Sequence, residues 1–271
     1  MNLVVPCPAK INLFLSVGPL DGSGFHPIRT VFQAVSLFDT LGIKSADTDS
    51  FQCDDPSIPA DNTVTKAWRL AREYVDLPTA SVTLWKKIPQ KSGLGGGSSD
   101  AAGLLRWLVR ATDGRFSERE AMEVAAAVGS DVPFFLVGGR TRGEGYGQVL
   151  TPLDDEPGNW LVIVMPKAAV CTKGAYAELD RQPRVLKEFP PDPATVDNDF
   201  LSAAPVQSVA AIERLKHLGA KSVGLTGSGA AVFGFCDSEV QAMAIADTQD
   251  PEWQSAWACH TLTRKESLWT S

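Results

Sequence analysis

The sequence predicts a two-domain protein in which α-helices and β-strands are mixed. Segments with the two-residue period of a strand alternate with segments of helical period, and the sequence contains no internal repeat. A length of 271 residues suits two domains of ordinary size. The stretch LTPLDDEPGNW at 150–160 is rich in turn formers and acidic residues, so we expect a boundary near residue 153. The two predicted domains are residues 1–153 and 154–271.

The first half begins with alternating, β-branched and aromatic residues, which predict strands that Pro6 and Pro8 interrupt. The period then becomes helical in DNTVTKAWRLAREYV, where Asp61 or Asn62 is suited to the N-cap position. The predicted elements of this half are strands at 2–5, 10–17, 30–45 and 81–89 and helices at 61–75, from about 100 and at 117–130.

Two helix ends in the chain carry recognisable caps. Ser117 and Glu120 have the spacing of a capping box, and Gly129 stands near the end of the same helix. The second half continues the alternation of strands and helices. Its predicted elements are strands at 160–166, 221–225, 230–236 and 257–263 and helices at 173–179, 205–218 and 238–247.

The composition limits the possible partners. A net charge of −7 provides no basic surface for nucleic acid, and no run of 18 apolar residues predicts a membrane span. The N-terminus lacks the basic region of a secretory signal, so we expect a cytoplasmic protein. The five cysteines are far apart and the chain has three histidines, so neither a disulfide framework nor a structural metal site is expected.

The stretch KSGLGGGSSDAAGLLRWL at 91–108 combines glycines and hydroxyl residues in front of a predicted helix. Glycine lets backbone N–H groups turn toward a ligand, and the helix directs its positive dipole end to the same point. These features predict an anion site, most naturally for phosphate, although a loop that only caps the helix would have the same composition. The loop fits neither G-x-x-x-x-G-K-[ST] nor G-x-G-x-x-G.

This stretch resembles the ATP-phosphate loop of the GHMP kinases, a family of small-molecule kinases. The pattern P-x-x-x-G-L-[GA]-[GS]-[GS]-[SA]-[SA] is matched by IPQKSGLGGGSSDAAG at 88–103. CPAKINLFLSV at 7–17 and LTGSGAAVFGF at 225–235 resemble the other two motifs of the family, in the same order. The resemblance implies an α+β fold with an N-terminal domain like ribosomal protein S5 domain 2, a C-terminal ferredoxin-like domain, and an active site between them.

Within the family, the chain resembles the branch that phosphorylates the 2-hydroxyl of a cytidine diphosphate conjugate of methylerythritol. The segments DGSGFHPIRTVFQAVSLFDTL, VGSDVPFFL, GEGYGQVLTPL and NDF carry this resemblance. Homoserine and mevalonate kinases lack the G-[YF]-H element, here Gly24, Phe25 and His26. This branch acts in the non-mevalonate route to isoprenoid precursors.

The resemblance implies specific roles for individual residues. Asp131 matches the base that accepts the proton of the substrate hydroxyl, and Lys10 matches its partner cation. A surface aspartate and a lysine that reaches solvent are the alternatives. Ser99 is expected to reach Mg²⁺, and Asp100 adds a negative charge near the phosphates. ATP and its phosphates would be held by Pro89, Gln90, Lys91, Ser92, Gly93, Leu94, Gly95, Gly96, Gly97, Ser98 and Ser99, with Asn62 on the adenosine side unless it is only an N-cap.

The substrate-binding residues are also implied by resemblance. Phe25 would stack on the cytosine ring and His26 would hydrogen-bond its edge, with Tyr176 as the opposite wall or as a core residue. Asn12 would contact the methylerythritol hydroxyls. Thr226 and Gly227 belong to a turn beside the phosphates, or to a turn without a ligand.

Three functions remain possible on these grounds. The first is the kinase for the cytidylated methylerythritol, a monomer or weak homodimer that binds a small molecule and neither nucleic acid nor a membrane. The second is a GHMP kinase for homoserine or for a mevalonate-pathway substrate. The third is a nucleotide-binding regulator without catalysis, which the presence of Lys10 and Asp131 disfavours.

Overall fold

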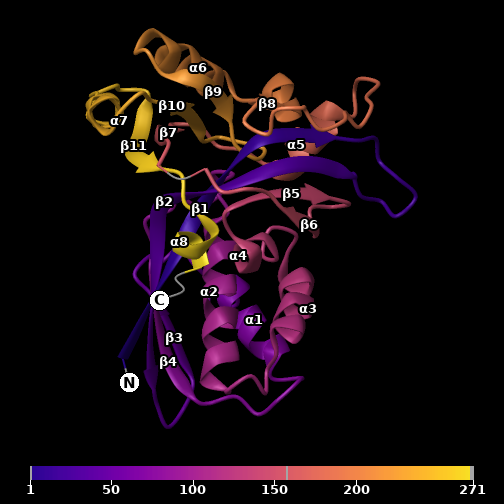
Figure 1. Cartoon of the computed structure of the whole chain (residues 1–271), viewed down its shortest axis with the longest axis vertical. Helices are drawn as coiled ribbons and strands as arrows, with labels where there is room; N and C mark the ends of the chain where they lie inside the picture. The colour runs from indigo at the N-terminus through magenta and orange to yellow at the C-terminus, as the bar shows by residue number, and fades with distance from the viewer. Residues whose placement is uncertain (1, 157, 269–271) are drawn as a thin grey trace.

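The computed structural model describes residues 2–156 and 158–268, which form two β-sheets arranged one above the other along the long axis of the molecule (Figure 1). Within this part of the chain, the N-terminal sheet has seven strands and the C-terminal sheet has four. The N-terminal sheet consists of β1 (Asn2–Val17), β2 (Ile28–Ser45), β3 (Ser50–Cys53), β4 (Ala80–Trp85), β5 (Arg140–Glu144), β6 (Val149–Pro152) and β8 (Asp197–Asn198). The C-terminal sheet consists of β7 (Trp160–Pro166), β9 (Lys221–Leu225), β10 (Val232–Phe235) and β11 (Trp253–His260).

The first strand is continuous where the sequence predicted two pieces. β1 pairs with β2 along its whole length, with a register shift between Pro8 and Ala9. On its other side β1 pairs with β8 only at Phe14 and Leu15. The stretch with Pro6 and Pro8 thus has an edge position among the described strands, where proline is tolerated because no second ladder needs its N–H.

Helices cover one face of the N-terminal sheet (Figure 1). The capping box of Ser117 and Glu120 is present, and Gly129 is the C-cap of that helix, so both predictions are confirmed. Asn62 is also the centre of a capping box, in which its side chain accepts hydrogen bonds from Val64 and Thr65. The helices of this layer are α1 (Thr63–Ala71), α2 (Gly96–Ala111), α3 (Glu118–Val128) and α4 (Phe134–Val137).

The C-terminal sheet has its own helices. The predicted strand at 160–166 and the helices near 173–179, 205–218 and 238–247 are all present. The predicted last strand at 257–263 instead runs from Trp253 to His260. The helical segments of this half are α5 (Thr172–Leu179), a 3-10 helix at Asp199–Ala203, α6 (Val206–His217), α7 (Glu239–Ala246) and α8 (Arg264–Leu268).

The two halves of the chain are joined by more than one connection. β8 belongs to the N-terminal sheet although it follows β7 in the sequence, and α8 packs against α4. Thr261 forms an isolated bridge with Val35 of β2. The chain changes sheet between Pro152 and Trp160, and a domain boundary at residue 153 stays a prediction.

Candidate active site

The glycine-rich loop connects β4 to α2 and faces the turn between β9 and β10. Gly93 and Gly95 have φ angles of 82° and 74°, which disfavour other residues. A Cβ on Gly93 would lie 2.1 Å from the Thr226 carbonyl oxygen, and one on Gly95 would lie 2.8 Å from the ring of Phe135. These glycines therefore allow the loop backbone to approach both halves of the chain closely.

The loop leaves the start of α2 open to a ligand. Gly95 is the N-cap of this 16-residue helix and has no side chain that could accept hydrogen bonds from the first turn. The free N–H groups and the positive end of the helix dipole therefore favour an anion. A cavity of about 300 Å³ lies in front of them, which we call the loop cavity. Its lining includes Asn62, Lys86, Pro89, Gln90, Lys91, Ser92, Gly93, Gly95, Gly96, Gly97, Ser98 and Asp100.

Leu94 and Ser99 were predicted to hold ATP, but their side chains do not line the loop cavity. Leu94 is fully buried and packs in the hydrophobic core behind the loop. Ser99 is also fully buried, and its Oγ has no hydrogen-bond partner among the described residues. Ser98, by contrast, lines both the loop cavity and its neighbour.

Lys10 from β1 and Asp131 from the turn after α3 come together in the wall of the next cavity. Their Nζ and Oδ2 atoms are 3.4 Å apart, the side chain of Lys10 is 3% exposed, and that of Asp131 is 32% exposed. The backbone N–H of Lys10 donates to the carbonyl of Leu94 at 3.0 Å, which fixes β1 against the loop. Both residues line a cavity of about 340 Å³, which we call the central cavity.

Asn12 fixes the lysine and the β9–β10 turn to each other. Its Oδ1 accepts hydrogen bonds from Lys10 Nζ at 2.7 Å and from the Gly227 backbone at 2.9 Å. Its Nδ2 donates to Thr30 Oγ1 at 2.8 Å. Asn12 and Gly227 line the central cavity, while Thr226 is fully buried and holds the Asn12 backbone through its hydroxyl.

A third cavity, which we call the aromatic cavity, has a volume of about 780 Å³ and is lined by Phe25, His26, Tyr146 and Tyr176. The rings of His26 and Tyr176 stack with centroids 4.9 Å apart, so no further ring fits between them. Phe25 is 63% exposed and packs against Tyr146 at 5.6 Å. Burial and the nearby charge of Asp131 raise the pKa of Tyr176.

The three cavities are neighbours that share walls. Lys91, Gly93 and Ser98 line both the loop cavity and the central cavity. Ser130, Tyr146 and Tyr176 line both the central cavity and the aromatic cavity. The pair Lys10–Asp131 therefore lies between an anion-binding helix end and an aromatic compartment.

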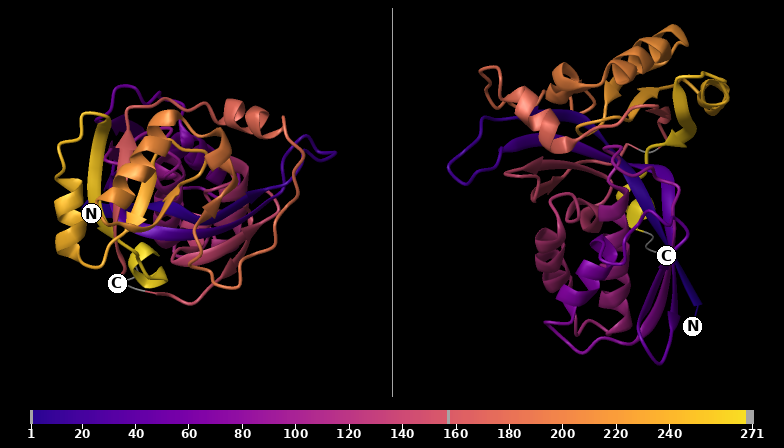
Figure 2. Two further views of the ribbon diagram at one scale, coloured as in Figure 1. Left: turned by 90° about the horizontal axis from the view of Figure 1, so that it is seen from above. Right: turned by 180° about the vertical axis from the view of Figure 1, so that it is seen from behind.

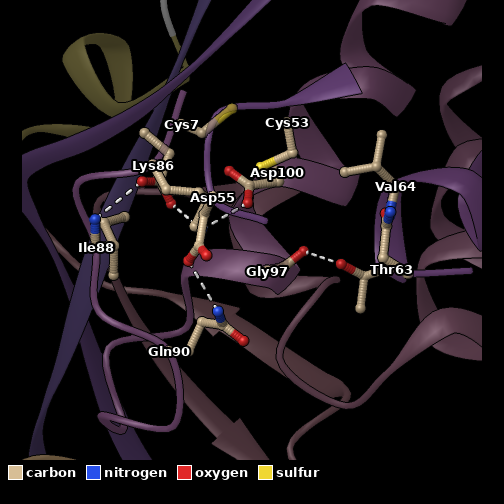
Figure 3. A network of polar contacts seen from close by, with 12 residues as sticks. Cys7, Cys53, Asp55, Thr63, Val64, Lys86, Ile88, Gln90, Gly97 and Asp100 are labelled. Atoms are coloured by element: carbon tan, nitrogen blue, oxygen red, sulfur yellow. Dashed lines mark hydrogen bonds and ion pairs between the residues drawn. The ribbon is translucent and has the colours of Figure 1, made fainter. Parts of the chain in front are cut away.

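A second lysine lies beneath the loop and was not singled out in the sequence. Lys86 forms ion pairs with Asp39 and with Asp100, the latter at 2.9 Å, and Figure 3 shows Lys86 and Asp100 pointing toward each other. Asp39 also accepts hydrogen bonds from the backbone N–H groups of Lys87 and Ile88. The one sequence feature that could have predicted this cluster is Asp39, an aspartate inside the apolar strand sequence SLFDTL.

This cluster explains the charge of Asp100 near the predicted phosphate site. Burial and the neighbouring carboxylate of Asp39 raise the pKa of Asp100 to about 8, against the opposing effect of Lys86. Lys86 is itself buried, which lowers its pKa, but the two carboxylates outweigh this and raise it overall. The cluster therefore favours a proton on Asp100 beside the charged lysine at neutral pH.

The described residues include no helix that is long and apolar enough to cross a membrane.

Comparison with known proteins identifies the class. The models of the GHMP kinase N-terminal and C-terminal domains match residues 62–139 and 207–248. A protein of Geobacter metallireducens is 34% identical over 272 residues, which cover 93% of this chain and 96% of that protein. The chain belongs to the GHMP kinase family, and the predicted two-part fold is confirmed.

Individual relatives narrow the comparison. The Geobacter metallireducens protein is named 4-diphosphocytidyl-2-C-methyl-D-erythritol kinase. So is a protein of Salinibacter ruber, 35% identical over 93% of this chain and 96% of that protein. A crystal structure of 4-(cytidine 5'-diphospho)-2C-methyl-D-erythritol kinase has a TM-score of 0.78 at 29% identity and covers 96% of this chain and 99% of that one. Homoserine kinase from Cytophaga hutchinsonii, with a TM-score of 0.70 at 16% identity, covers 97% of this chain and 95% of that one and shares the fold.

Proposed function

We propose that this protein transfers the γ-phosphate of ATP to the 2-hydroxyl of 4-diphosphocytidyl-2-C-methyl-D-erythritol. The observation that carries the proposal is the order of the three cavities. An anion-binding helix end, a lysine–aspartate pair and an aromatic compartment follow one another through shared walls. This order matches a phosphoryl donor, a reacting centre and an acceptor that carries a nucleobase.

ATP would place its phosphates at the open start of α2. The N–H groups of the first turn and the backbone of Gly93, Gly95 and Gly96 provide donors without a competing side-chain cap. Lys91 and Ser98 stand where the loop cavity meets the central cavity, so they would contact the phosphate being transferred. Asn62 would remain an N-cap whose exposed edge borders the adenosine side.

A divalent cation would need few protein ligands in this site. No group of three or more His, Cys, Asp or Glu side chains within residues 2–156 and 158–268 could hold a metal. The buried Oγ of Ser99 has no hydrogen-bond partner among the described residues, and Mg²⁺ takes oxygen ligands, including those of substrate phosphates. To hold Mg²⁺ together with the phosphates, the Ser99 hydroxyl would have to turn from its buried position toward the loop cavity, and Mg²⁺ would neutralise the phosphates' negative charge.

The reaction then requires a base at the acceptor hydroxyl. Asp131 accepts the proton of the acceptor hydroxyl while the oxygen of that hydroxyl bonds to the γ-phosphorus. The bond from the γ-phosphorus to the β,γ-bridging oxygen breaks at the same time, and ADP is released. Lys10 is held by Asn12 beside Asp131, so its charge stabilises the negative charge that develops on the transferred group. The partial exposure of Asp131 on the central cavity allows a substrate to reach it.

The cytidine group would occupy the aromatic cavity. Phe25 offers an exposed ring face for stacking. The ring nitrogens of His26 lie 3.0 Å from the Gly18 carbonyl oxygen and 3.4 Å from Asp180 Oδ2, so the base would replace Asp180 at Nε2. Because His26 already stacks on Tyr176, the base would stack on Phe25 and meet Tyr176 at the far wall. The methylerythritol hydroxyls would lie near Asn12, and Thr226 would act through the backbone of Gly227.

Purified protein with ATP and Mg²⁺ provides the test. We expect ADP formation with 4-diphosphocytidyl-2-C-methyl-D-erythritol and background rates with homoserine and with mevalonate. Equal rates with an acceptor that lacks the cytidine group would contradict the proposed substrate and favour another GHMP kinase. Binding of ATP without turnover on any acceptor would favour a regulator.

We also propose a cytoplasmic protein that acts on a small molecule as a monomer or weak homodimer. The acidic composition supports the absence of a nucleic-acid partner. Cell fractionation and sedimentation at several protein concentrations test these statements.

A further inference from the structure

We propose that Tyr146 is a specificity-determining residue that fastens the tip of the β1–β2 hairpin and thereby positions Phe25 for the nucleobase. This inference rests on the proposed function for the identity of the substrate. The contact itself is independent of that function.

The hairpin needs an external support. Both views of Figure 2 show that β1 and β2 extend beyond the body of the molecule, and their connection carries Phe25 and His26. Within the connection, Gly18 N–H donates to the Pro27 carbonyl at 2.7 Å and Asp21 N–H donates to the Phe25 carbonyl at 2.9 Å. These bonds close the tip on itself but do not hold it against the cavity.

Tyr146 supplies the support from a segment 125 residues away. Its hydroxyl donates to Asp21 Oδ2 at 2.8 Å and lies 2.8 Å from Ser23 Oγ. Ser23 Oγ donates to Asp21 Oδ1 at 2.5 Å, so Asp21 accepts from both hydroxyls. The hydrogen bonds from Ser23 and then from Tyr146 lower the pKa of Asp21, so the carboxylate is ionised when it accepts them.

The turn that carries Tyr146 is itself anchored. The Tyr146 backbone N–H donates to Gln148 Oε1 at 2.7 Å, and Ile28 N–H donates to the Gly145 carbonyl at 2.7 Å. The second bond joins this turn to the first residue of β2. Tyr146 is thus fixed next to the last strand pair, Val17–Ile28, and reaches the loop that connects the two strands.

The position of the ring gives the contact a consequence for binding. Tyr146 lines both the central cavity and the aromatic cavity, and its ring packs on Phe25. His26 has other anchors, since Nδ1 lies 3.0 Å from the Gly18 carbonyl and the ring stacks on Tyr176. Phe25 has the Tyr146 ring as its aromatic neighbour in the described structure, so loss of the tyrosine contact acts mainly on Phe25.

The test compares variants that separate the hydroxyl from the ring. Tyr146→Phe removes the hydrogen bond to Asp21 and keeps the packing on Phe25, whereas Tyr146→Ala removes both. We expect the KM for 4-diphosphocytidyl-2-C-methyl-D-erythritol to rise about 3- to 10-fold in Tyr146→Phe and about 10- to 100-fold in Tyr146→Ala, because binding must then order the hairpin. The KM for ATP and the melting temperature should stay unchanged.

Tyr74→Phe is the matched control. Tyr74 is similarly exposed and donates to a carboxylate, Glu123 Oε2, at 3.3 Å, but it lies in the helical layer and lines none of the three cavities. A general effect of removing a tyrosine hydroxyl would appear in this variant as well. We expect its KM for the acceptor to equal that of the wild type.

Asp21→Asn tests the residue that accepts the hydrogen bond of the Tyr146 hydroxyl. Because both changes break the same contact, the double variant with Tyr146→Phe should raise the KM for the acceptor no further than the larger single change does. Backbone hydrogen exchange over residues 19–26 of the ligand-free protein should quicken in Tyr146→Phe. If hydrogen exchange in Tyr146→Phe is unchanged, the proposed role of Tyr146 is wrong, whatever the substrate. If the wild type is inactive on the cytidylated acceptor, only the proposed function is refuted. The proposed role of Tyr146 is also wrong if exchange over residues 19–26 quickens in Tyr146→Phe while the KM for the acceptor, or the affinity for cytidine diphosphate, stays unchanged.

Discussion

The molecule contains two lysine–aspartate clusters a short distance apart, and they have opposite characters. Lys10 meets one carboxylate, Asp131, which is one-third exposed and opens on the central cavity. Lys86 meets two carboxylates, Asp39 and Asp100, whose side chains are at most 2% exposed. The first pair is open to a substrate, whereas the second borders the loop cavity with almost no exposed side-chain surface.

The difference shows how the same chemistry can serve reaction or architecture. An exposed carboxylate with a single cation can exchange protons with a bound hydroxyl. A buried lysine between two carboxylates has no such access, and its removal leaves charges that water cannot solvate. We therefore expect changes at the first pair to alter turnover and changes at the second to alter stability.

The largest effect should follow from Asp131→Asn. The amide cannot accept the proton of the acceptor hydroxyl, so kcat should fall by about 10²- to 10⁴-fold. Because Asp131 is partly exposed, the melting temperature should change little. Steady-state kinetics with thermal denaturation test both statements, and full turnover in this variant would refute its role as base.

Lys10→Met should produce the next largest loss of turnover. The methionine keeps the aliphatic part of the side chain but removes the charge beside the transferred phosphate, so kcat should fall about 10²- to 10³-fold. Asp131 stays accessible to water, and the fold should persist. Circular dichroism and single-turnover kinetics separate the two effects. A collapse of the fold would show that Lys10 belongs with the structural cluster.

Lys86→Met should act on stability instead. The change leaves Asp39 and Asp100 buried without their cation, which should lower the free energy of unfolding by about 3–5 kcal/mol. Urea denaturation at neutral pH measures this quantity. An unfolding midpoint equal to that of the wild type would contradict the contrast between the two clusters.

Asp100→Asn should have the smallest effect on turnover, and its effect on stability should be visible in the pH dependence. The folded-state pKa of Asp100 is raised to about 8 from an ordinary value of 3.8, so the folded protein retains a proton that the unfolded chain releases. Stability from this group is therefore complete below about pH 4 and declines as the pH rises to about 8. The asparagine variant should lack this decline, so its stability relative to the wild type should increase between about pH 5 and pH 8.

Urea denaturation across that pH range provides the measurement. Because the raised pKa keeps a proton on Asp100 at neutral pH, this carboxyl adds little negative charge beside the phosphates, and we expect the KM for ATP to remain within about threefold of the wild-type value. Parallel stability curves for the two proteins would refute the raised pKa.

Sequence patterns predicted the elements whose signals are local. The strand at 160–166 is a short apolar run, and the helix at Glu118–Val128 carries a capping box within four residues, so both were recognised. β8 has two residues and forms only because β1 offers an edge to it, so no local pattern could have revealed it. Pro6 and Pro8 misled the prediction of β1, because their effect depends on whether a second strand lies beside them.

The residues of the site also differ in whether a local sequence pattern could predict them. The glycine-rich loop and Asp131 lie in recognisable motifs, and the structure brings Lys10 to within 3.4 Å of Asp131. Asp39 and Lys86 are 47 residues apart, and only the β2–β4 pairing reveals that they meet. Leu94 and Ser99 belong to the loop motif, but the path of the backbone turns their side chains inward, which the motif alone does not specify.

The placement of β8 and α8 predicts how a truncated form of the protein would behave. The N-terminal sheet receives an edge strand from residues 197–198, and α4 is covered by residues 264–268. A fragment that ends near residue 153 would expose the edge of β1 and the apolar surface under α8, and aggregation would be the expected result.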